Sequence, residues 1–202
     1  MNLSSLIGLV TPYCPNVPDF VFEGAILECA RDYFDKTKSW IVQGSLTAPA
    51  GTNLFTIDAP ESNMVVVSID SVELVDSGQQ LEPVPQVNNF PVQSTPTCYA
   101  LLRRDTIKLY PTPKSSTNLT INIAVKPTFA ATEIDDQIFE DNAEAIKNGT
   151  IAILKRQVGT DWYDPEAANY FQRQYELGIG DKKLEMQTNF NPNALEIATP
   201  YQ

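Results

Sequence analysis

The chain has 202 residues, and 43% of them are hydrophobic, which is enough for a packed core without disulfides or a structural metal. Its 25 acidic and 14 basic side chains give a formal charge of −11 at pH 7. This excess would repel a phosphate backbone or an anionic bilayer, so the composition argues against tight binding of nucleic acid or of such a membrane. No segment approaches the run of roughly 20 apolar residues that a membrane span needs.

The sequence also lacks the groups on which most catalytic sites depend. It contains no histidine, which removes Ser-His-Asp and Cys-His nucleophile systems and imidazole metal ligands. Cys14, Cys29 and Cys98 lie far apart without a CxxC pattern, which indicates buried free thiols. No phosphate-binding glycine loop or nucleophile-elbow motif is present. We therefore expect no cofactor, no metal and no enzymatic activity.

Helical periodicity dominates the first 40 residues. Leu3, Leu6, Ile7 and Val10 fall at helical spacing and predict a short helix. Prolines then interrupt the chain before a stronger helix from Asp19 to about Ser39. The inward stripe of the second helix comprises Phe22, Ile26, Cys29, Ala30 and Tyr33. A second apolar line at seven-residue spacing, formed by Phe20, Leu27 and Phe34, predicts cover on another side as well. We expect these three residues to contact a neighbouring subunit.

From residue 41 to 127 the apolar period changes to two, and Val, Ile, Thr and Pro become frequent, as in an antiparallel β region. The apolar phase shifts between Ile69 and Val72, which predicts a bulge in that strand. Residues 76–97 contain four prolines and are predicted to form a long projecting loop. The predicted strands are Leu54 to Asp58, Met64 to Val75, Tyr99 to Arg103, Thr106 to Tyr110 and one around Leu119 to Val125.

The helical period returns in residues 128–186. Gly149 falls in the middle of one predicted helix, where glycine is costly unless a close helix crossing requires it. Asp164 followed by Pro165 predicts the start of the last helix, and Gly178 and Gly180 are expected to loosen its end. The inward residues of that helix are predicted to be Ala168, Phe171 and Tyr175.

The last segment, residues 187–202, has neither a helical nor an alternating period. It is predicted to be extended or disordered in isolation. Apolar residues are nevertheless spaced along it, as in a docking peptide, although a tail that folds back on its own domain is the alternative. The candidate partner-binding residues of this tail are Phe190, Leu195, Ile197 and Tyr201.

Two patterns leave other functions open. Paired carboxylates at Asp135-Asp136, Glu140-Asp141 and Asp161 to Asp164 could serve glycoside hydrolysis, but acids at helix starts are the favoured interpretation. Trp162 and Tyr163 could form a sugar platform, but a corner that anchors the last helix is favoured. A carbohydrate-binding or depolymerising domain and a cytoplasmic regulator that binds a host protein are thus the alternatives to a structural role.

Two segments of the sequence carry a resemblance to a known family. The first runs from Leu9-Val10-Thr11-Pro12-Tyr13-Cys14-Pro15 through Pro18-Asp19 to Trp40. The second runs from Ala145-Ile146-Lys147-Asn148-Gly149 through Trp162-Tyr163-Asp164-Pro165 to Gly178. Both resemble the head-to-tail adaptor, or upper neck, proteins of short-tailed bacteriophages, including connectors of the tubular tail protein A type. Together they cover less than half of the chain, and neither is a catalytic fingerprint.

The resemblance implies a structural virion protein of the neck and tail that is assembled in the cytoplasm of the host bacterium. In such a connector, a homo-oligomeric ring of twelve copies docks on the portal protein and links it to the tail nozzle protein. DNA then passes through the channel without specific binding, and the C-terminal extension contacts the portal.

The pattern and the resemblance together predict an α+β fold. We expect a helical bundle of about four helices with an inserted antiparallel β domain and an extended C-terminal tail. The predicted divisions are residues 1–40 for the N-terminal helices, 41–127 for the β insertion, 128–186 for the C-terminal helices and 187–202 for the docking tail.

Overall fold

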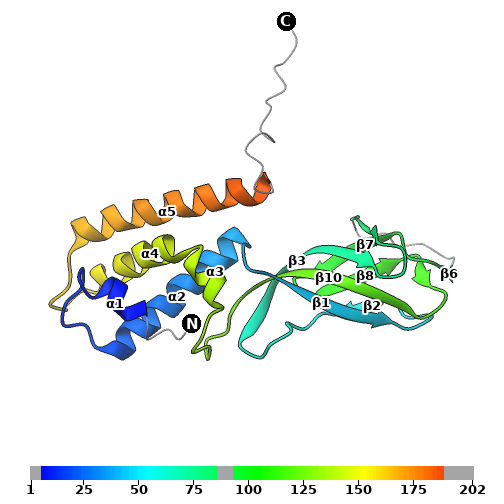
Figure 1. Cartoon of the computed structure of the whole chain (residues 1–202), viewed down its shortest axis with the longest axis horizontal. Coiled ribbons are helices and arrows are strands. Elements are labelled where there is room, and N and C mark those ends of the chain that lie inside the picture. The colour runs from blue at the N-terminus through cyan, green and yellow to red at the C-terminus, as the bar shows by residue number, and fades with distance from the viewer. Residues whose placement is uncertain (1–5, 86–92, 189–202) are drawn as a thin grey trace, which may run out of the picture. The chain divides into compact units, whose positions relative to one another are not determined.

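The structure, a computed structural model, describes residues 6–85 and 93–188. The chain divides into two units (Figure 1). The helical unit comprises residues 6–39 and 132–188 of the described chain, and the β unit comprises residues 40–85 and 93–131. Each unit has its own set of buried apolar side chains.

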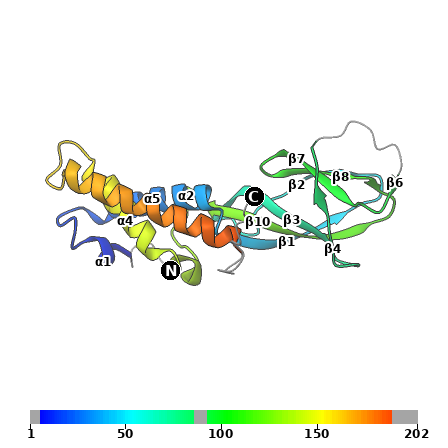
Figure 2. The ribbon, with the colours of Figure 1, turned by 90° about the horizontal axis from the view of Figure 1, so that it is seen from above.

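Five helices form the described part of the helical unit. They are α1 (Ile7–Val10), α2 (Asp19–Thr37), α3 (Asp136–Glu140), α4 (Ala143–Lys155) and α5 (Pro165–Gln187). Within this unit α4 packs against both α2 and α5, and Figure 2 shows α5 running lengthwise along the unit. The predicted inward stripe of α2 is confirmed, because Phe22, Ile26, Cys29, Ala30 and Tyr33 are all buried.

Glycines set the helix spacing in this unit. A Cβ atom at Gly149 of α4 would overlap Cys29 Sγ of α2 and would lie 2.8 Å from Cδ2 of Tyr175 in α5. A Cβ atom at Gly178 would lie 2.9 Å from the Cβ atom of Ala145. The close crossing predicted at Gly149 is therefore confirmed. The predicted loosening at Gly178 is wrong, because that glycine lets α5 pack closely on α4 and the helix continues to Gln187.

The described strands of the β unit form three sheets. The first sheet has the order β1-β10-β3-β4, the second β2-β8-β7-β5, and the third β6-β9. Their bounds are β1 (Ile41–Ala48), β2 (Leu54–Thr56), β3 (Met64–Leu74), β4 (Gln79–Gln80), β5 (Glu82–Pro83), β6 (Gln93–Ser94), β7 (Cys98–Arg103), β8 (Thr106–Tyr110), β9 (Thr112–Pro113) and β10 (Thr117–Pro127).

The strands β3 and β10 form the longest antiparallel pairing of this unit. Their register passes from Ser71 opposite Asn122 to Ile69 opposite Ile123, so that Asp70 is the extra residue of a bulge. The bulge predicted between Ile69 and Val72 is therefore confirmed. The residues of β10 that face the core are fully buried, namely Leu119, Ile121, Ile123 and Val125.

The predicted fold class, a bundle of about four helices with an inserted antiparallel β domain, is wrong. The β unit is a large part of the chain rather than a small insertion, and its described strands form three sheets. Two of their pairings are parallel, those of β5 with β7 and of β6 with β9. The extended C-terminal tail of the prediction falls on residues 189–202, which lie outside the described residues.

The extra helix arises at Asn142, which separates α3 from α4. The Asn142 side chain donates a hydrogen bond from Nδ2 to the carbonyl of Ile138 at 2.6 Å and accepts one from the Tyr33 hydroxyl at 2.8 Å. Such side-chain bonds compete with continuous helical backbone bonding. The helix therefore ends at Glu140 and starts again at Ala143.

The long loop predicted for residues 76–97 is also partly wrong, because three short strands lie within it, namely β4, β5 and β6. Leu81 is buried, and its amide donates to the carbonyl of Val72 at 2.8 Å. The amide of Glu82 donates to the carbonyl of Thr97 at 3.1 Å. Pro83 does not prevent the pairing of β5 with β7, because a residue of an edge strand does not always need an amide hydrogen for pairing.

Candidate interaction surfaces of the helical unit

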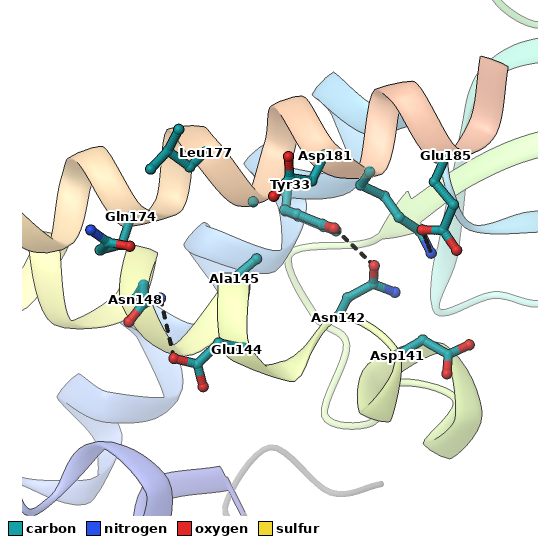
Figure 3. A pocket seen from close by; sticks show the side chains of 12 residues that line it. Tyr33, Asp141, Asn142, Glu144, Ala145, Asn148, Gln174, Leu177, Asp181 and Glu185 are labelled. Atoms are coloured by element: carbon teal, nitrogen blue, oxygen red, sulfur yellow. Dashed lines mark hydrogen bonds and ion pairs between the residues drawn. The ribbon is translucent and has the colours of Figure 1, made fainter. Parts of the chain in front are cut away.

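A pocket of about 440 Å³ opens between the α3–α4 segment and α5 (Figure 3). Asp141 and Glu144 line it from one side, and Asp181 and Glu185 line it from α5. Leu177 supplies an apolar part of the wall. The remaining lining residues are Tyr33, Asn142, Ala145, Asn148, Gln174, Gly178 and Lys182.

The pocket carries an excess of negative charge. Glu144 is paired with Lys147 at 2.6 Å, and Glu185 is paired with Lys182 at 2.9 Å. No lysine or arginine of the described residues forms an ion pair with Asp141 or Asp181. The pocket would therefore disfavour a phosphate or another anion.

The floor of the pocket is held by a hydrogen bond from the Tyr33 hydroxyl to Asn142 Oδ1 at 2.8 Å, drawn as a dashed line in Figure 3. Burial raises the pKa of Tyr33 well above its ordinary value, and the nearby charge of Glu185 adds to the rise. The phenol is thus a stable hydrogen-bond donor. Its role here is to fix the break between α3 and α4.

A second polar cluster, which is only partly buried, joins α2 and α5. The Tyr175 hydroxyl donates to Asp32 Oδ2 at 2.8 Å, and Lys36 Nζ lies 2.6 Å from the same oxygen. Burial raises the pKa of Tyr175, and Cys29 and Asp32 add to the effect. Burial also raises the pKa of Cys29 to about 12, so the thiol stays protonated and is a poor nucleophile.

The polar groups of the pocket floor and of this cluster are thus engaged in structural contacts. No group of three or more metal-ligating side chains gathers among the described residues. The interpretation of the paired carboxylates as helix caps is confirmed for Asp135, which accepts a bond from the amide of Ile138 at 3.0 Å, and for Asp164, which accepts one from the amide of Ala167 at 3.0 Å. Over the same residues, no helix has the length and apolar character needed to cross a bilayer.

Trp162 lies at the corner before α5, as expected. Its indole Nε1 donates to Gln157 Oε1 at 3.2 Å, and the Asp164 amide donates to the carbonyl of Lys155 at 2.9 Å. Asp164 is the N-cap of α5 and Pro165 follows at its first turn, as predicted. The Trp162 ring is partly buried, so it offers only part of its surface for stacking on a sugar.

The predicted interface residues of α2 have different surroundings. Phe20 is 75% exposed, Leu27 is half-buried, and Phe34 is fully buried and packs edge-on against Tyr33 with ring centroids 5.5 Å apart. Only Phe20 and Leu27 thus present surface to a neighbour in this structure. The predicted tail residues Phe190, Leu195, Ile197 and Tyr201 lie outside the described residues.

Sequence reasoning missed an exposed apolar line on α5. Tyr170 is 58% exposed, Leu177 is 60% exposed and Leu184 is 45% exposed, and they follow one another at seven-residue spacing. They therefore lie on one side of the helix, away from the buried Tyr175 and Ile179. The spacing was visible in the sequence, but the stronger inward pattern of Ala168 and Tyr175 concealed it.

The helical unit thus presents exposed apolar residues on the sides of α2 and α5, which suits a protein that acts through contacts. A family model described as SU10 adaptor protein matches residues 1–196. The chain belongs to this family. The predicted resemblance to phage head-to-tail adaptors is therefore confirmed at the level of the family. No curated protein matches the chain in the sequence comparison.

Membership of the SU10 adaptor family gives the chain a coarse role. It is a structural adaptor of a bacteriophage and a component of the virion, and it interacts with other phage head and tail proteins. Adaptors of this kind are structural proteins that are not typically enzymes. An adaptor works through contacts with other proteins, and the exposed sides of α2 and α5 are candidates for these contacts.

Proposed function

We propose that this SU10 adaptor is a head-to-tail connector that docks on the portal ring and links it to the tail nozzle. The observation that carries the proposal is the family match over residues 1–196, which includes both units. The exposed apolar sides of α2 and α5 support it, because a monomer that worked alone would gain nothing by exposing Phe20 and Leu177.

The connector would act as a closed ring around the DNA path. By analogy with the portal, twelve copies would form it, and each copy would need two different faces for its two neighbours. The net charge of −11 supports a channel role, because an acidic wall releases no counterions from DNA and therefore does not hold it. DNA would pass without specific binding.

The C-terminal segment would supply the portal contact. The last described helix ends at Gln187, and the amide of its C-cap Thr188 donates to the carbonyl of Leu184 at 3.0 Å. The following residues place apolar side chains at Phe190, Leu195, Ile197 and Tyr201. Ordering of this segment on the portal would couple assembly of the connector to the presence of its partner.

The test is a deletion of residues 189–202, which leaves the Thr188 cap of α5 in place. We expect the truncated chain to keep the circular dichroism of the full chain and to lose co-sedimentation with purified portal rings. A full-length chain in which the four apolar tail residues are changed to serine controls for length, and it should lose binding too. Portal binding equal to that of the full chain in both variants would refute the role of the tail.

A further inference from the structure

Two exposed helix faces of the helical unit share one pattern. The α2 face consists of Phe20, Gly24 and Leu27, and the α5 face consists of Leu177, Gly180 and Leu184, extended by Tyr170. In each face two apolar residues seven positions apart flank an exposed glycine in the middle of a helix. Residues at these spacings lie on the same side of an α-helix.

The two glycines have no use within the described structure. A Cβ atom at Gly24 or at Gly180 would meet nothing within 4 Å, whereas one at Gly149 or Gly178 would collide with a neighbouring helix. Glycine inside a helix is destabilising relative to alanine, and close approach of another backbone is a reason to keep it. Gly149 and Gly178 allow helices of the same chain to approach each other closely. Gly24 and Gly180 would allow the same close approach, but no helix of the described chain lies against them.

The two faces point outward from one centre. Cys29 and Tyr175 both contact the site of Gly149. Leu27 lies two residues before Cys29, and Leu177 lies two residues after Tyr175, which is about half a helical turn in each case. Both leucines therefore point away from Gly149, on α2 and on α5 respectively. Within the unit α4 packs against both of these helices.

The charges around the faces also complement each other. Arg173 is exposed between Tyr170 and Leu177 on the α5 face, and no ion pair occupies it among the described residues. Glu23 and Glu28 flank the α2 face, and Glu28 is exposed. A helix carrying the α2 face would thus bring carboxylates to Arg173, on the edge of the α5 face opposite to Asp181.

We infer that the α2 face of one copy of this chain packs against the α5 face of the next copy. The inference rests on the proposed connector function and names the contact that closes its ring. A head-to-tail ring needs two different, complementary faces directed away from each other on each subunit. These two faces satisfy that requirement, and a single partner of another kind would leave one of them uncovered.

The experiment is disulfide cross-linking of the chain that carries both Gly24→Cys and Gly180→Cys, assembled into rings as judged by negative-stain electron microscopy with portal present. The three native cysteines are buried, so the introduced pair provides the reactive thiols of the described surface. Oxidation should produce a ladder of dimers, trimers and larger species on a non-reducing gel. Each single variant alone should give no ladder, and an equal mixture of the two should stop at dimers.

A matched control pairs Gly24→Cys with Val158→Cys, since Val158 is 81% exposed but lies outside both faces. Rings of this control should not cross-link. Rings of the test variant that form without a ladder would overturn the inference and leave the connector function intact. If the unmodified chain forms no ring with portal, the proposed function itself fails.

A second measurement covers the case in which the paired cysteines hinder assembly. Leu27→Asp should spoil only the α2 face and Leu177→Asp only the α5 face, so neither variant should form rings. Their mixture keeps one intact face of each kind and should form a dimer that grows no further, as measured by light scattering. Rings from either variant alone, or a mixture that stays monomeric while the unmodified chain assembles, would contradict the pairing.

Discussion

The two units of this adaptor treat their apolar side chains differently. In the β unit the exposed apolar residues are scattered over strand ends and edges, as with Leu54 in β2 and Leu101 near the β7–β8 turn. In the helical unit Tyr170, Leu177 and Leu184 line up along α5 at seven-residue spacing, and Phe20 and the half-buried Leu27 have the same spacing on α2. Other exposed apolar residues of this unit, such as Val158, lie outside these lines. Single exposed apolar residues are ordinary, but an aligned set on a helix marks a contact surface.

The difference concerns the surfaces of the two units rather than their cores. The central strand β10 pairs with β1 on one side and β3 on the other, and its inward residues are fully buried. The helical unit also packs tightly around Gly149, yet it leaves two apolar faces open. We therefore assign assembly contacts to the helices and internal stability to the core around β10.

The largest expected effect comes from opening a cavity in the β unit. Ile123→Ala removes a fully buried side chain and should lower the free energy of unfolding by about 2–5 kcal/mol. Leu177→Ala, the matched control on the open α5 face, should change it by less than about 0.5 kcal/mol. Urea titration followed by circular dichroism compares the two. Equal losses would show that the α5 face is as fully packed as β10.

The next effect tests the close helix packing. Gly149→Ala forces a Cβ atom against Cys29 and Tyr175 and should destabilise the chain by about 1–3 kcal/mol. The same substitution at Gly24 meets open space, so it should stabilise the chain by about 0.5–1 kcal/mol. Thermal unfolding of the two variants should therefore shift in opposite directions. A stabilising Gly149→Ala would contradict the packing described here.

A smaller contrast separates the two buried phenols. Tyr33→Phe leaves the buried Asn142 Oδ1 without its donor and should cost about 1–3 kcal/mol of unfolding free energy. Tyr175→Phe leaves Asp32 with Lys36 and partial access to water, so it should cost about 0.5–1.5 kcal/mol. Chemical denaturation measures both. A larger loss at Tyr175 would reverse the order that burial predicts.

The smallest effect links stability to assembly. Gly180→Ala adds a methyl group in open space and should raise the unfolding free energy by about 0.5–1 kcal/mol. The same methyl group would hold a neighbouring helix away from α5, so the variant should need a higher protein concentration to form rings. Light scattering across a concentration series measures this. If the Gly180→Ala variant were more stable and also formed rings at a lower protein concentration, Gly180 would have no role in the contact.

Local patterns in the sequence predicted the elements well wherever one signal dominated. The inward stripe of α2, the Asp164 cap of α5, the bulge near Asp70 and the close crossing at Gly149 all follow from residue type and spacing. Each depends on residues that are neighbours in the sequence or on one helix face. Such features need no knowledge of distant partners.

Features set by distant residues could not be predicted in this way. The division between α3 and α4 depends on Tyr33, which is 109 positions from its partner Asn142. The short parallel pairing of Glu82 with Cys98 directly follows the buried Leu81, and the proline-rich composition gave no signal for either feature. The exposed apolar face of α5 was missed because the prediction for this helix used only the residues expected to face the core.

The central claim is that this chain works as a structural adaptor by adding a ring to a larger phage assembly. Electron microscopy of purified portal rings mixed with an excess of the chain tests it most directly. The account predicts an additional ring of density on one end of the portal, with the helical units of neighbouring copies in contact. Portal rings that remain unchanged at saturating concentrations of the folded chain would contradict it.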